Sequence, residues 1–495
     1  MRAGVTYAAR LVLLGGATVL AFFSGGYFDQ PRAWAGLIAW VLVAVAVALD
    51  GRALPRSRGA WLALGGLALL AAWTLLSIAW APIAGSAYHA GQLVMLYVGV
   101  LLAAMLLLRS PPAQRIVEPA LAAGALIVTG YGILGRLLPG VLHFSRSISA
   151  QGRLEQPLTY WNATGELAAL GFVLCARIAG EAQRPRALRA AAAAASAPLG
   201  LGLYLSFSRG ALFACAAGLV ALIVAAPRRE QLEGIVIAIS AAVLSSIAAA
   251  PFKGVTSLAG ALGTRERQGA IVLVLLVAIG AAAAAAQRHR ARRAQAAPLR
   301  LPNHAAWITL VLICAGMALA IVVGSKESAN RPLSGGASRY VTLQSNRYAY
   351  WRVAFRAFGD EPLHGVGAGG WAVWWLRYRP FNDFAQDAHS LPLQTLAELG
   401  LVGVALLGAF FAGVGLAARS ANRIAPALAA GPIAGFVVYA AHAPLDWDWQ
   451  MPAVTLVAIV LAGALLALSG EAQSSSAIRG ASRRKIQTAN THTAA

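Results

Sequence analysis

The sequence contains little charge and very few acidic residues. Of its 495 residues, 12% are charged and 59% are hydrophobic, whereas about a quarter of the residues in an ordinary soluble domain are charged. Apolar stretches of about 17 to 25 residues recur along the whole chain, which is the length that a helix needs to cross a bilayer. The chain lacks the alternating pattern of about ten residues that membrane β-strands require. We therefore expect an all-α, polytopic bundle of transmembrane helices in a lipid bilayer rather than a soluble domain.

Cysteines and common catalytic motifs are also scarce. Cys175, Cys215 and Cys314 fall inside or beside predicted spans, without the spacing of a metal site or a disulfide, so we expect them to pack in the interior. The chain lacks an Asp-x-Asp in a soluble segment, a Gly-x-x-x-x-Gly-Lys-Ser/Thr loop and a His/Cys/Asp cluster with metal spacing. These absences argue against a nucleotide-sugar donor held through Mg²⁺. We expect no metal and no other cofactor.

Basic residues outnumber acidic ones, 40 to 18. The Arg residues fall in short loops between apolar runs rather than on one soluble face, so we expect no nucleic-acid partner. Cytoplasmic loops of membrane proteins carry an excess of Lys and Arg, and every second loop of this chain does so. This alternation predicts that both termini are cytoplasmic.

The apolar pattern also divides the chain into parts. About 14 apolar segments are present, and we expect 12 to 14 spans. We expect transmembrane helices 1 to 11 within residues 1–324, a large extracytoplasmic loop over 325–391 and the last transmembrane helices over 392–470. Residues 471–495 are rich in Ser, Gln, Thr and Ala, which predicts a disordered cytoplasmic tail. The outer loop is rich in Arg, against the usual rule, which suggests that these Arg residues are kept for an anion.

The longest polar interval, from about Ser345 to Leu401, contains the residues best suited to chemistry. Its motifs are Arg347-x-x-x-Trp351-Arg352, Pro362-Leu-His-Gly365-Val-Gly367, Asp387-Ala-His389-Ser390 and Glu398-Leu-Gly400. The apolar residues after Arg347 recur at helical spacing, so we expect a short helix with Arg347 at the edge of its apolar face. The glycines that follow permit a tight turn or a close approach to a ligand.

This order of motifs resembles the O-antigen ligase and polymerase family of integral membrane proteins over about residues 200 to 415. In that family, Arg-x-x-x-Trp, Pro-Leu-x-Gly-x-Gly, Ala-His-(Asn/Ser) and Glu-x-Gly-x-x-Gly follow one another. Here the last motif ends at Gly403, and Ser390 stands where many relatives have Asn. The resemblance implies a GT-C-like fold in the bacterial cytoplasmic (inner) membrane, with the active site on the outer, periplasmic side.

The resemblance also implies an activity. Such a protein transfers a glycan from an undecaprenyl-diphosphate-linked donor to an acceptor hydroxyl, as a metal-independent, inverting glycosyltransferase. Ligases, polymerases and protein O-oligosaccharyltransferases share these motifs, so a lipid, a polysaccharide or a protein acceptor stays open.

Three residues are the candidates for catalysis. The resemblance makes His389 the catalytic residue, and its ordinary pKa of about 6.5 suits a general base; by itself it could equally be a solvated loop His. Arg347 and Arg209, which lies in a Ser-Arg-Gly motif at the end of a span, can bind a diphosphate bidentately. Arg209 can alternatively extend to lipid head groups.

Several other residues are candidates for substrate binding or for its support. They are Asn162, Trp351, Arg352, Gly365, Gly367, Ser390, His442 and Asp446. Asn162 can alternatively cap a helix. Asp446 lies about one helical turn after His442, where it can support the histidine or take part directly. Trp371, Trp374, Trp375 and Tyr378 resemble an amphipathic segment on the membrane surface, and their rings can alternatively stack on sugars.

A transporter or flippase for a lipid-linked oligosaccharide is the alternative from another functional class, beside a passive assembly scaffold. It would account for the many spans and the outer cations. Ion-coupled carriers usually place acidic groups inside their spans, and almost none occurs in the middle of a span here, which favours the enzyme.

Overall fold

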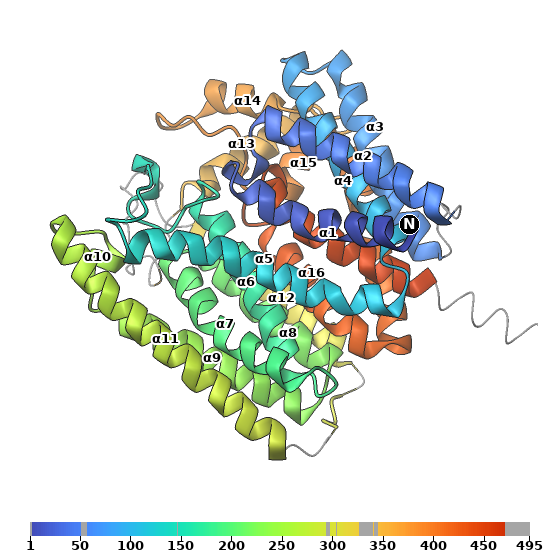
Figure 1. Cartoon of the computed structure of the whole chain (residues 1–495). Helices are drawn as coiled ribbons and strands as arrows, with labels where there is room; N and C mark the ends of the chain where they lie inside the picture. The colour runs from blue at the N-terminus through green and yellow to red at the C-terminus, as the bar shows by residue number, and fades with distance from the viewer. Residues whose placement is uncertain are drawn as a thin grey trace, which may run out of the picture.

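The structure is a computed structural model that describes residues 2–50, 57–145, 147–293, 298–302, 304–325, 340 and 345–470. This part of the chain is a bundle of long α-helices (Figure 1). Eleven helices are long and apolar enough to cross a membrane: α1 Arg2–Ala21, α2 Asp29–Asp50, α3 Arg58–Leu76, α4 Ala84–Leu107, α5 Pro111–Leu137, α6 Trp161–Gly180, α7 Arg186–Leu205, α9 Arg229–Ala249, α11 Leu262–Arg293, α15 Leu391–Ile424 and the final helix Pro452–Gly470. Three further apolar helices are α8 Arg209–Ala225, α12 Ala305–Ser325 and α16 Pro426–His442.

The predicted fold class is confirmed. Each of the apolar segments expected from the sequence lies in one of these helices. The expected disordered tail, residues 471–495, lies outside the described residues, as do residues 326–339 and 341–344 of the predicted outer loop. The described remainder of that loop contains two short helices, α13 Arg347–Asp360 and α14 Gly370–Tyr378, which lie together at one end of the bundle (Figure 1).

Two helices form the centre of the bundle. Every residue of α6 from Asn162 to Gly180 is buried, and so is every residue of the final helix, Pro452–Gly470. Neither helix faces lipid over these lengths, because neighbouring helices surround both. Polar side chains on α6 therefore lie inside protein, where they can form hydrogen bonds with other helices instead of meeting hydrocarbon.

The long helix α15 is interrupted at Gly400, which has φ of +63° and ψ of −161°. Other residues rarely adopt this conformation. The loop between α13 and α14 packs against the interruption, and a Cβ on Gly400 would lie 2.3 Å from a backbone oxygen of that loop. The amide of Leu401 donates to the carbonyl of Pro362 at 2.9 Å, and the amide of Gly367 donates to that of Glu398 at 2.9 Å. Backbone groups freed by the break are thus bonded by the loop, and α13 and α14 are joined to α15.

A second hydrophobic cluster packs α13, α14 and the first turns of α15 together. Trp371 and Trp375 of α14 are fully buried in it, with stacked rings whose centroids are 5.8 Å apart. The prediction that Trp371 and Trp375 lie on the membrane surface was therefore wrong. Trp374 and Tyr378 are half-buried, and their place on the membrane surface stays a prediction. An amphipathic pattern shows which helix face is apolar but not what covers it, and here α13 and α15 cover it.

Candidate functional site

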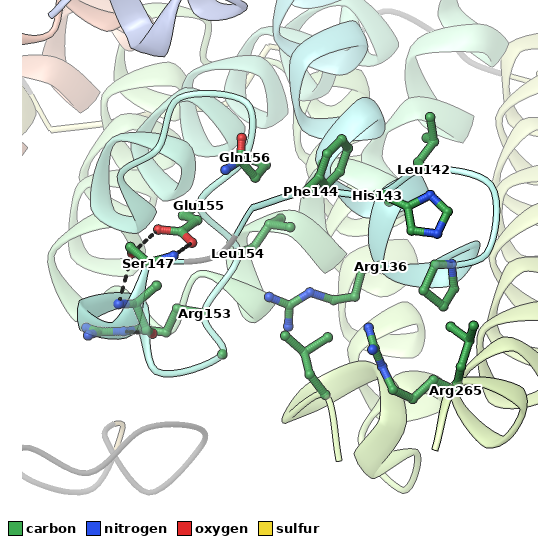
Figure 2. Close-up of a pocket in the computed structure, with 17 residues that line it drawn as sticks. Arg136, Leu142, His143, Phe144, Ser147, Arg153, Leu154, Glu155, Gln156 and Arg265 are labelled. Carbon is green, nitrogen blue, oxygen red and sulfur yellow. Dashed lines mark hydrogen bonds between the residues drawn. The ribbon is translucent and has the colours of Figure 1, made fainter. Parts of the chain in front are cut away.

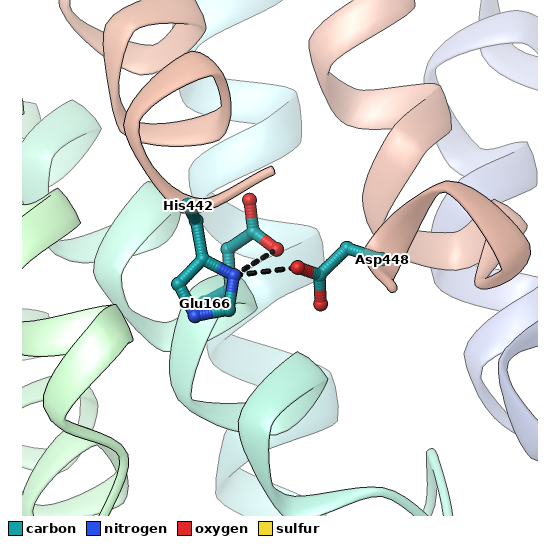
Figure 3. A group of neighbouring side chains, drawn as sticks. All are labelled: Glu166, His442 and Asp448. Atoms are coloured by element: carbon teal, nitrogen blue, oxygen red, sulfur yellow. Dashed lines mark hydrogen bonds and ion pairs between the residues drawn. The ribbon is translucent and has the colours of Figure 1, made fainter. Parts of the chain in front are cut away.

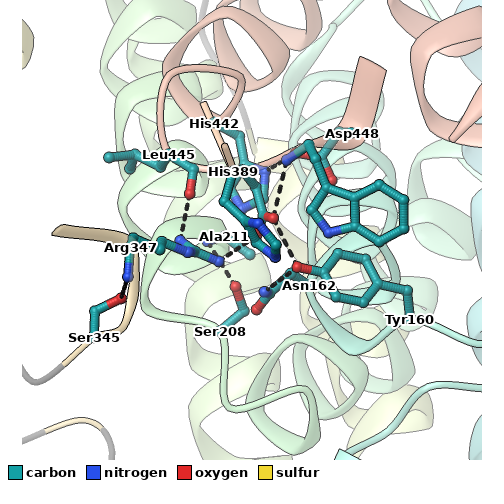
Figure 4. Close-up of polar contacts among 12 residues, drawn as sticks. Tyr160, Asn162, Ser208, Ala211, Ser345, Arg347, His389, His442, Leu445 and Asp448 are labelled. Carbon is teal, nitrogen blue, oxygen red and sulfur yellow. Dashed lines mark hydrogen bonds and ion pairs between the residues drawn. The ribbon is translucent and has the colours of Figure 1, made fainter. Parts of the chain in front are cut away.

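Arg347, the first residue of α13, forms an ion pair with Asp446 in the loop after α16 (Figure 4). The Arg347 Nη2 atom lies 2.5 Å from Asp446 Oδ2, and Nη1 also donates to the carbonyl oxygen of Leu445. The Asp446 side chain is fully buried, whereas 22% of the Arg347 side chain is exposed. These bonds use only part of the guanidinium's N–H donors, so Arg347 is oriented by protein and can still donate to an anion.

Residues at the start of α6 hold the other side of Asp446. The Tyr160 hydroxyl donates to Asp446 Oδ1 at 2.7 Å, and Asn162 Nδ2 donates to the Tyr160 oxygen at 2.8 Å. Burial alone would raise the pKa of Asp446, but the Arg347 guanidinium outweighs burial and holds that pKa below its usual value. Asp446 is therefore an anion at neutral pH. Helix α6 begins at Trp161 with Tyr160 as its N-cap, so the alternative of Asn162 as a helix cap was wrong.

His389 lies in the short connection that leads into α15. It has φ of +53°, and its Nδ1 is 2.9 Å from the carbonyl oxygen of Asp387. A carbonyl oxygen only accepts hydrogen bonds, so Nδ1 carries the proton and Nε2 of the neutral ring has a free lone pair. Burial lowers the pKa of His389 below its ordinary value. The ring is therefore neutral at neutral pH. It lies near Arg347 (Figure 4), and its centroid is 6.0 Å from that of the Trp447 ring.

His442, the last residue of α16, forms a second buried cluster with Glu166 and Asp448 (Figure 3). Its Nδ1 lies 2.5 Å from Asp448 Oδ2 and 3.1 Å from Glu166 Oε2, and all three side chains are fully buried. The prediction that Asp446 supports His442 was wrong, since Asp448 and Glu166 take that place.

These three residue types could ligate a metal ion, but their spacing fits hydrogen bonds better. Nitrogen and oxygen ligands about 2.0–2.2 Å from one zinc ion stand roughly 3.3 Å apart in a tetrahedron. Nδ1 and Asp448 Oδ2 are 2.5 Å apart, so they would have to separate before both could bind such an ion.

Arg209 is the first residue of α8, and the Ser208 hydroxyl caps this helix by accepting from the amide of Ala211 at 3.2 Å. A Cβ on Gly210 would lie 2.9 Å from His442 Nε2. The start of α8 therefore packs against the end of α16, directly before the loop that binds Arg347. The structure brings the Ser-Arg-Gly motif and Arg347 to the same short segment.

The other predicted residues of the large loop have different environments. Trp351 is buried in the second hydrophobic cluster, and Arg352 is exposed on α13. Gly365 and Gly367 have φ of +68° and +86°, which confirms the expected tight turns. Their close approach is to the protein's own backbone, since a Cβ on either would lie within 2.4 Å of it. Ser390 is buried at the N-cap of α15.

Sequence reasoning missed three residues of the site: Tyr160, Glu166 and Asp448. Glu166 carried a signal, because an acidic residue inside a predicted span is by default a candidate for function. It lies near the start of α6, as Glu118 lies near the start of α5. Neither contradicts the expectation of almost no acidic groups in the middle of a span, and that expectation gave no reason to single out Glu166.

A separate polar cavity of about 190 Å³ lies between the end of α5, the following loop and the start of α11 (Figure 2). Arg136 and Arg153 line it, but Arg136 donates to the carbonyl of Val255 at 3.1 Å and Arg153 to that of Ala150 at 2.7 Å. Arg136 thus joins α5 to the short helix Lys253–Thr256, and Arg153 bonds within its own segment. None of the residues that line this cavity belongs to the Arg347 site.

Comparison with known protein families gives a match to part of the chain. Residues 252–408 match the family model described as O-antigen ligase. No curated protein matches the chain. The match includes Arg347, His389 and the Pro-Leu-His-Gly and Glu-Leu-Gly motifs that meet at Gly400. Tyr160, Arg209 and Asp446 lie outside it. The polytopic helical fold agrees with this family, and over residues 252–408 the chain carries an O-antigen ligase domain.

Proposed function

We propose that this protein transfers a glycan from an undecaprenyl-diphosphate-type lipid carrier to an acceptor hydroxyl, without a metal and with inversion. The O-antigen ligase domain supports a membrane glycosyltransferase-like role. The proposal of the donor and the mechanism rests on one observation: a cation and a base are each held in place by protein groups, in the same part of the molecule. Arg347 is held by Asp446, and His389 has its Nδ1 proton held by a carbonyl.

The mechanism follows from these two groups. Arg347, together with Arg209, binds the diphosphate and stabilises the negative charge that grows on it as the glycosidic bond breaks. His389 Nε2 takes the proton of the acceptor hydroxyl, whose oxygen attacks the anomeric carbon from the opposite face. The electrons of the broken bond leave with the lipid diphosphate, and one direct displacement inverts the anomeric centre.

The orientation is part of the proposal. The Arg347 and His389 side would face outwards from the cytoplasmic membrane, with both termini in the cytoplasm, because alternate loops carry the Arg excess. A lipid, a polysaccharide or a protein side chain can supply the acceptor hydroxyl.

His389→Ala tests the role of the base. We expect transfer to fall by about 10²–10⁴, with binding of the lipid-diphosphate donor retained, because the arginines bind the donor. His364→Ala is the matched control, since His364 lies in the adjacent loop with its side chain 45% exposed. Near-normal turnover of the His389 variant would exclude His389 as the base.

The pH profile provides a second check on His389. Its pKa is lowered by burial, so the base stays neutral below an ordinary histidine's pKa of about 6.5. Activity should therefore hold through pH 6.5 and fall only as the pH drops through the lowered value.

The buried Glu166, His442 and Asp448 keep a transporter as the second candidate, because titratable groups inside a bundle are typical of ion-coupled carriers. Purified protein in vesicles, given a synthetic lipid-diphosphate glycan, separates the two. Transfer without ATP supports the enzyme, and movement across the bilayer without bond cleavage supports the carrier.

A further inference from the structure

A cavity of about 500 Å³ lies beside the segment that carries His389. It is formed by the connection between α1 and α2, the start of α4, helix α14 and the first turns of α15. This volume lies within the usual range of small-molecule sites, roughly 300–1,000 Å³. Much of its lining comes from the first hundred residues, outside the part that matches the O-antigen ligase family.

The lining is rich in groups that exchange hydrogen bonds with hydroxyls. The carboxylates and amides are those of Asp29, Asp387, Glu398, Gln386, Gln394 and Gln450. They are held by one another, by a tyrosine and by backbone. Gln394 Nε2 donates to Glu398 Oε1 at 2.8 Å, the Tyr27 hydroxyl donates to Gln386 at 3.1 Å, and the amide of Ala388 donates to Gln394 Oε1 at 2.5 Å. Carboxylates accept from neighbouring hydroxyls in pairs, and amides both accept and donate.

The charge of the cavity distinguishes it from the diphosphate site. Among the described residues that line it, Arg32 is the only Lys or Arg. Its Nη2 is occupied by Asp29 Oδ1 at 2.8 Å and by the Tyr27 carbonyl at 2.7 Å. Asp29 balances Arg32, and burial raises the pKa of Asp387 to about 7. The lining therefore offers no unbalanced Lys or Arg to hold a phosphate, whereas an uncharged ligand with many hydroxyls would be bound.

Aromatic rings add a second, independent feature. Phe28 and Phe384 line the cavity and are 60% and 78% exposed. A sugar presents apolar C–H groups on the faces of its ring and hydroxyls around its edge. Exposed flat rings beside carboxylates and amides match both parts of such a ligand.

The position of the cavity connects it to the proposed base. Asp387 is one of the residues that line the cavity, and its carbonyl oxygen accepts a hydrogen bond from His389 Nδ1. We propose that this cavity binds an uncharged saccharide, and that this saccharide is the acceptor glycan whose hydroxyl His389 deprotonates. The binding of a saccharide stands alone, whereas its role as acceptor rests on the proposed function.

Binding to the purified full-length protein tests the proposal. Saturation-transfer NMR with maltotriose, chitotriose and mannotriose measures saccharide binding, and calorimetry with inorganic pyrophosphate measures anion binding separately. Asp29→Ala and Gln386→Ala should weaken binding of the trisaccharide that binds best by about tenfold. Asp360→Ala and Asn382→Ala, which change exposed residues that do not line the cavity, should leave it unchanged.

The outcomes separate this inference from the proposed function. Binding of none of the three saccharides, or binding that ignores both cavity variants, would overturn the saccharide site. Pyrophosphate binding should depend on Arg347 and not on Asp29; loss of the dependence on Arg347 would count against the proposed function and leave the saccharide site standing. Thermal melting in detergent checks that each variant is folded. If Asp29→Ala does not fold, Asp29→Asn replaces it in the binding measurement.

Discussion

Replacing Asp446 is the most direct test of how the site is held together. Its carboxylate accepts from Arg347 Nη2 at 2.5 Å, from the Tyr160 hydroxyl at 2.7 Å and from its neighbour's amide at 3.0 Å. Asp446→Asn keeps the size of the side chain but removes the charge that balances Arg347. Removing one partner of a fully buried ion pair costs about 3–5 kcal/mol. Because 22% of the Arg347 side chain is exposed and water can reach it, we expect roughly 2–3 kcal/mol here.

A double-mutant cycle isolates this interaction. Unfolding of the parent, Arg347→Ala, Asp446→Ala and the double variant in detergent should give a coupling energy of about 2 kcal/mol. Pyrophosphate binding to Asp446→Asn should also weaken, because the guanidinium loses its orientation. Asp360→Asn, at an exposed position, is the control. Coupling below about 0.5 kcal/mol would show that Arg347 is positioned without Asp446.

The pH dependence of stability tests the same ion pair. Since the folded pKa of Asp446 is lowered, its contribution is present above the unfolded value of about 3.9 and is lost as the pH falls through the folded value. The difference in melting temperature between the parent and Asp446→Asn should therefore be constant from pH 8 to pH 5 and shrink below about pH 4. A difference in melting temperature that shrinks with rising pH would contradict the lowered pKa of Asp446.

Three further predictions concern stability and topology. Gly400→Ala should cost about 1–3 kcal/mol because of its positive φ, whereas Gly408→Ala in the same helix, with nothing within 4 Å of an added Cβ, should be neutral or stabilising; equal melting temperatures would refute the role of the break. Burial raises the pKa of Asp387 to about 7, so ionising it costs stability as the pH rises from about 4 to 7, and Asp387→Asn should melt higher than the parent at pH 8 but not at pH 4. With Cys314 replaced by Ser, Ala182→Cys should react with membrane-impermeant thiol reagents only from the cytoplasm and Asn382→Cys only from outside; reaction of both from one side would exclude the proposed topology.

Such labelling needs exposed positions. Both Ala182 and Asn382 are exposed, whereas Ser57, in a loop expected to be cytoplasmic, is buried with its hydroxyl 3.0 Å from that of Ser469.

Composition and periodicity were sufficient to predict the helices. The length of an apolar run is a local property, and a bilayer demands it of every spanning helix. Arg347 and His389 could also be chosen as candidates for the site, because each is part of a motif within one polar interval. Their partners could not, since nothing in the spacing of residues pairs Arg347 with Asp446 across the bundle or Glu166 with His442. The burial of Trp371 was missed for a similar reason, because its cover comes from helices before and after it in the chain.

The break at Gly400 fixes the distance along α15 between the docked loop and His389. Glu398 and Leu401, on either side of the break, form backbone hydrogen bonds with the α13–α14 loop. His389 lies just before Ser390, the N-cap of the helix. Inserting one residue between His389 and Glu398 would turn the histidine by about 100° around the helix axis and move it by about 1.5 Å, while the anchored end stayed in place. The number of residues between the Ala-His and Glu-x-Gly motifs therefore sets where His389 points. We expect natural insertions and deletions in related chains to fall before Asp387 or after the break, and not between them.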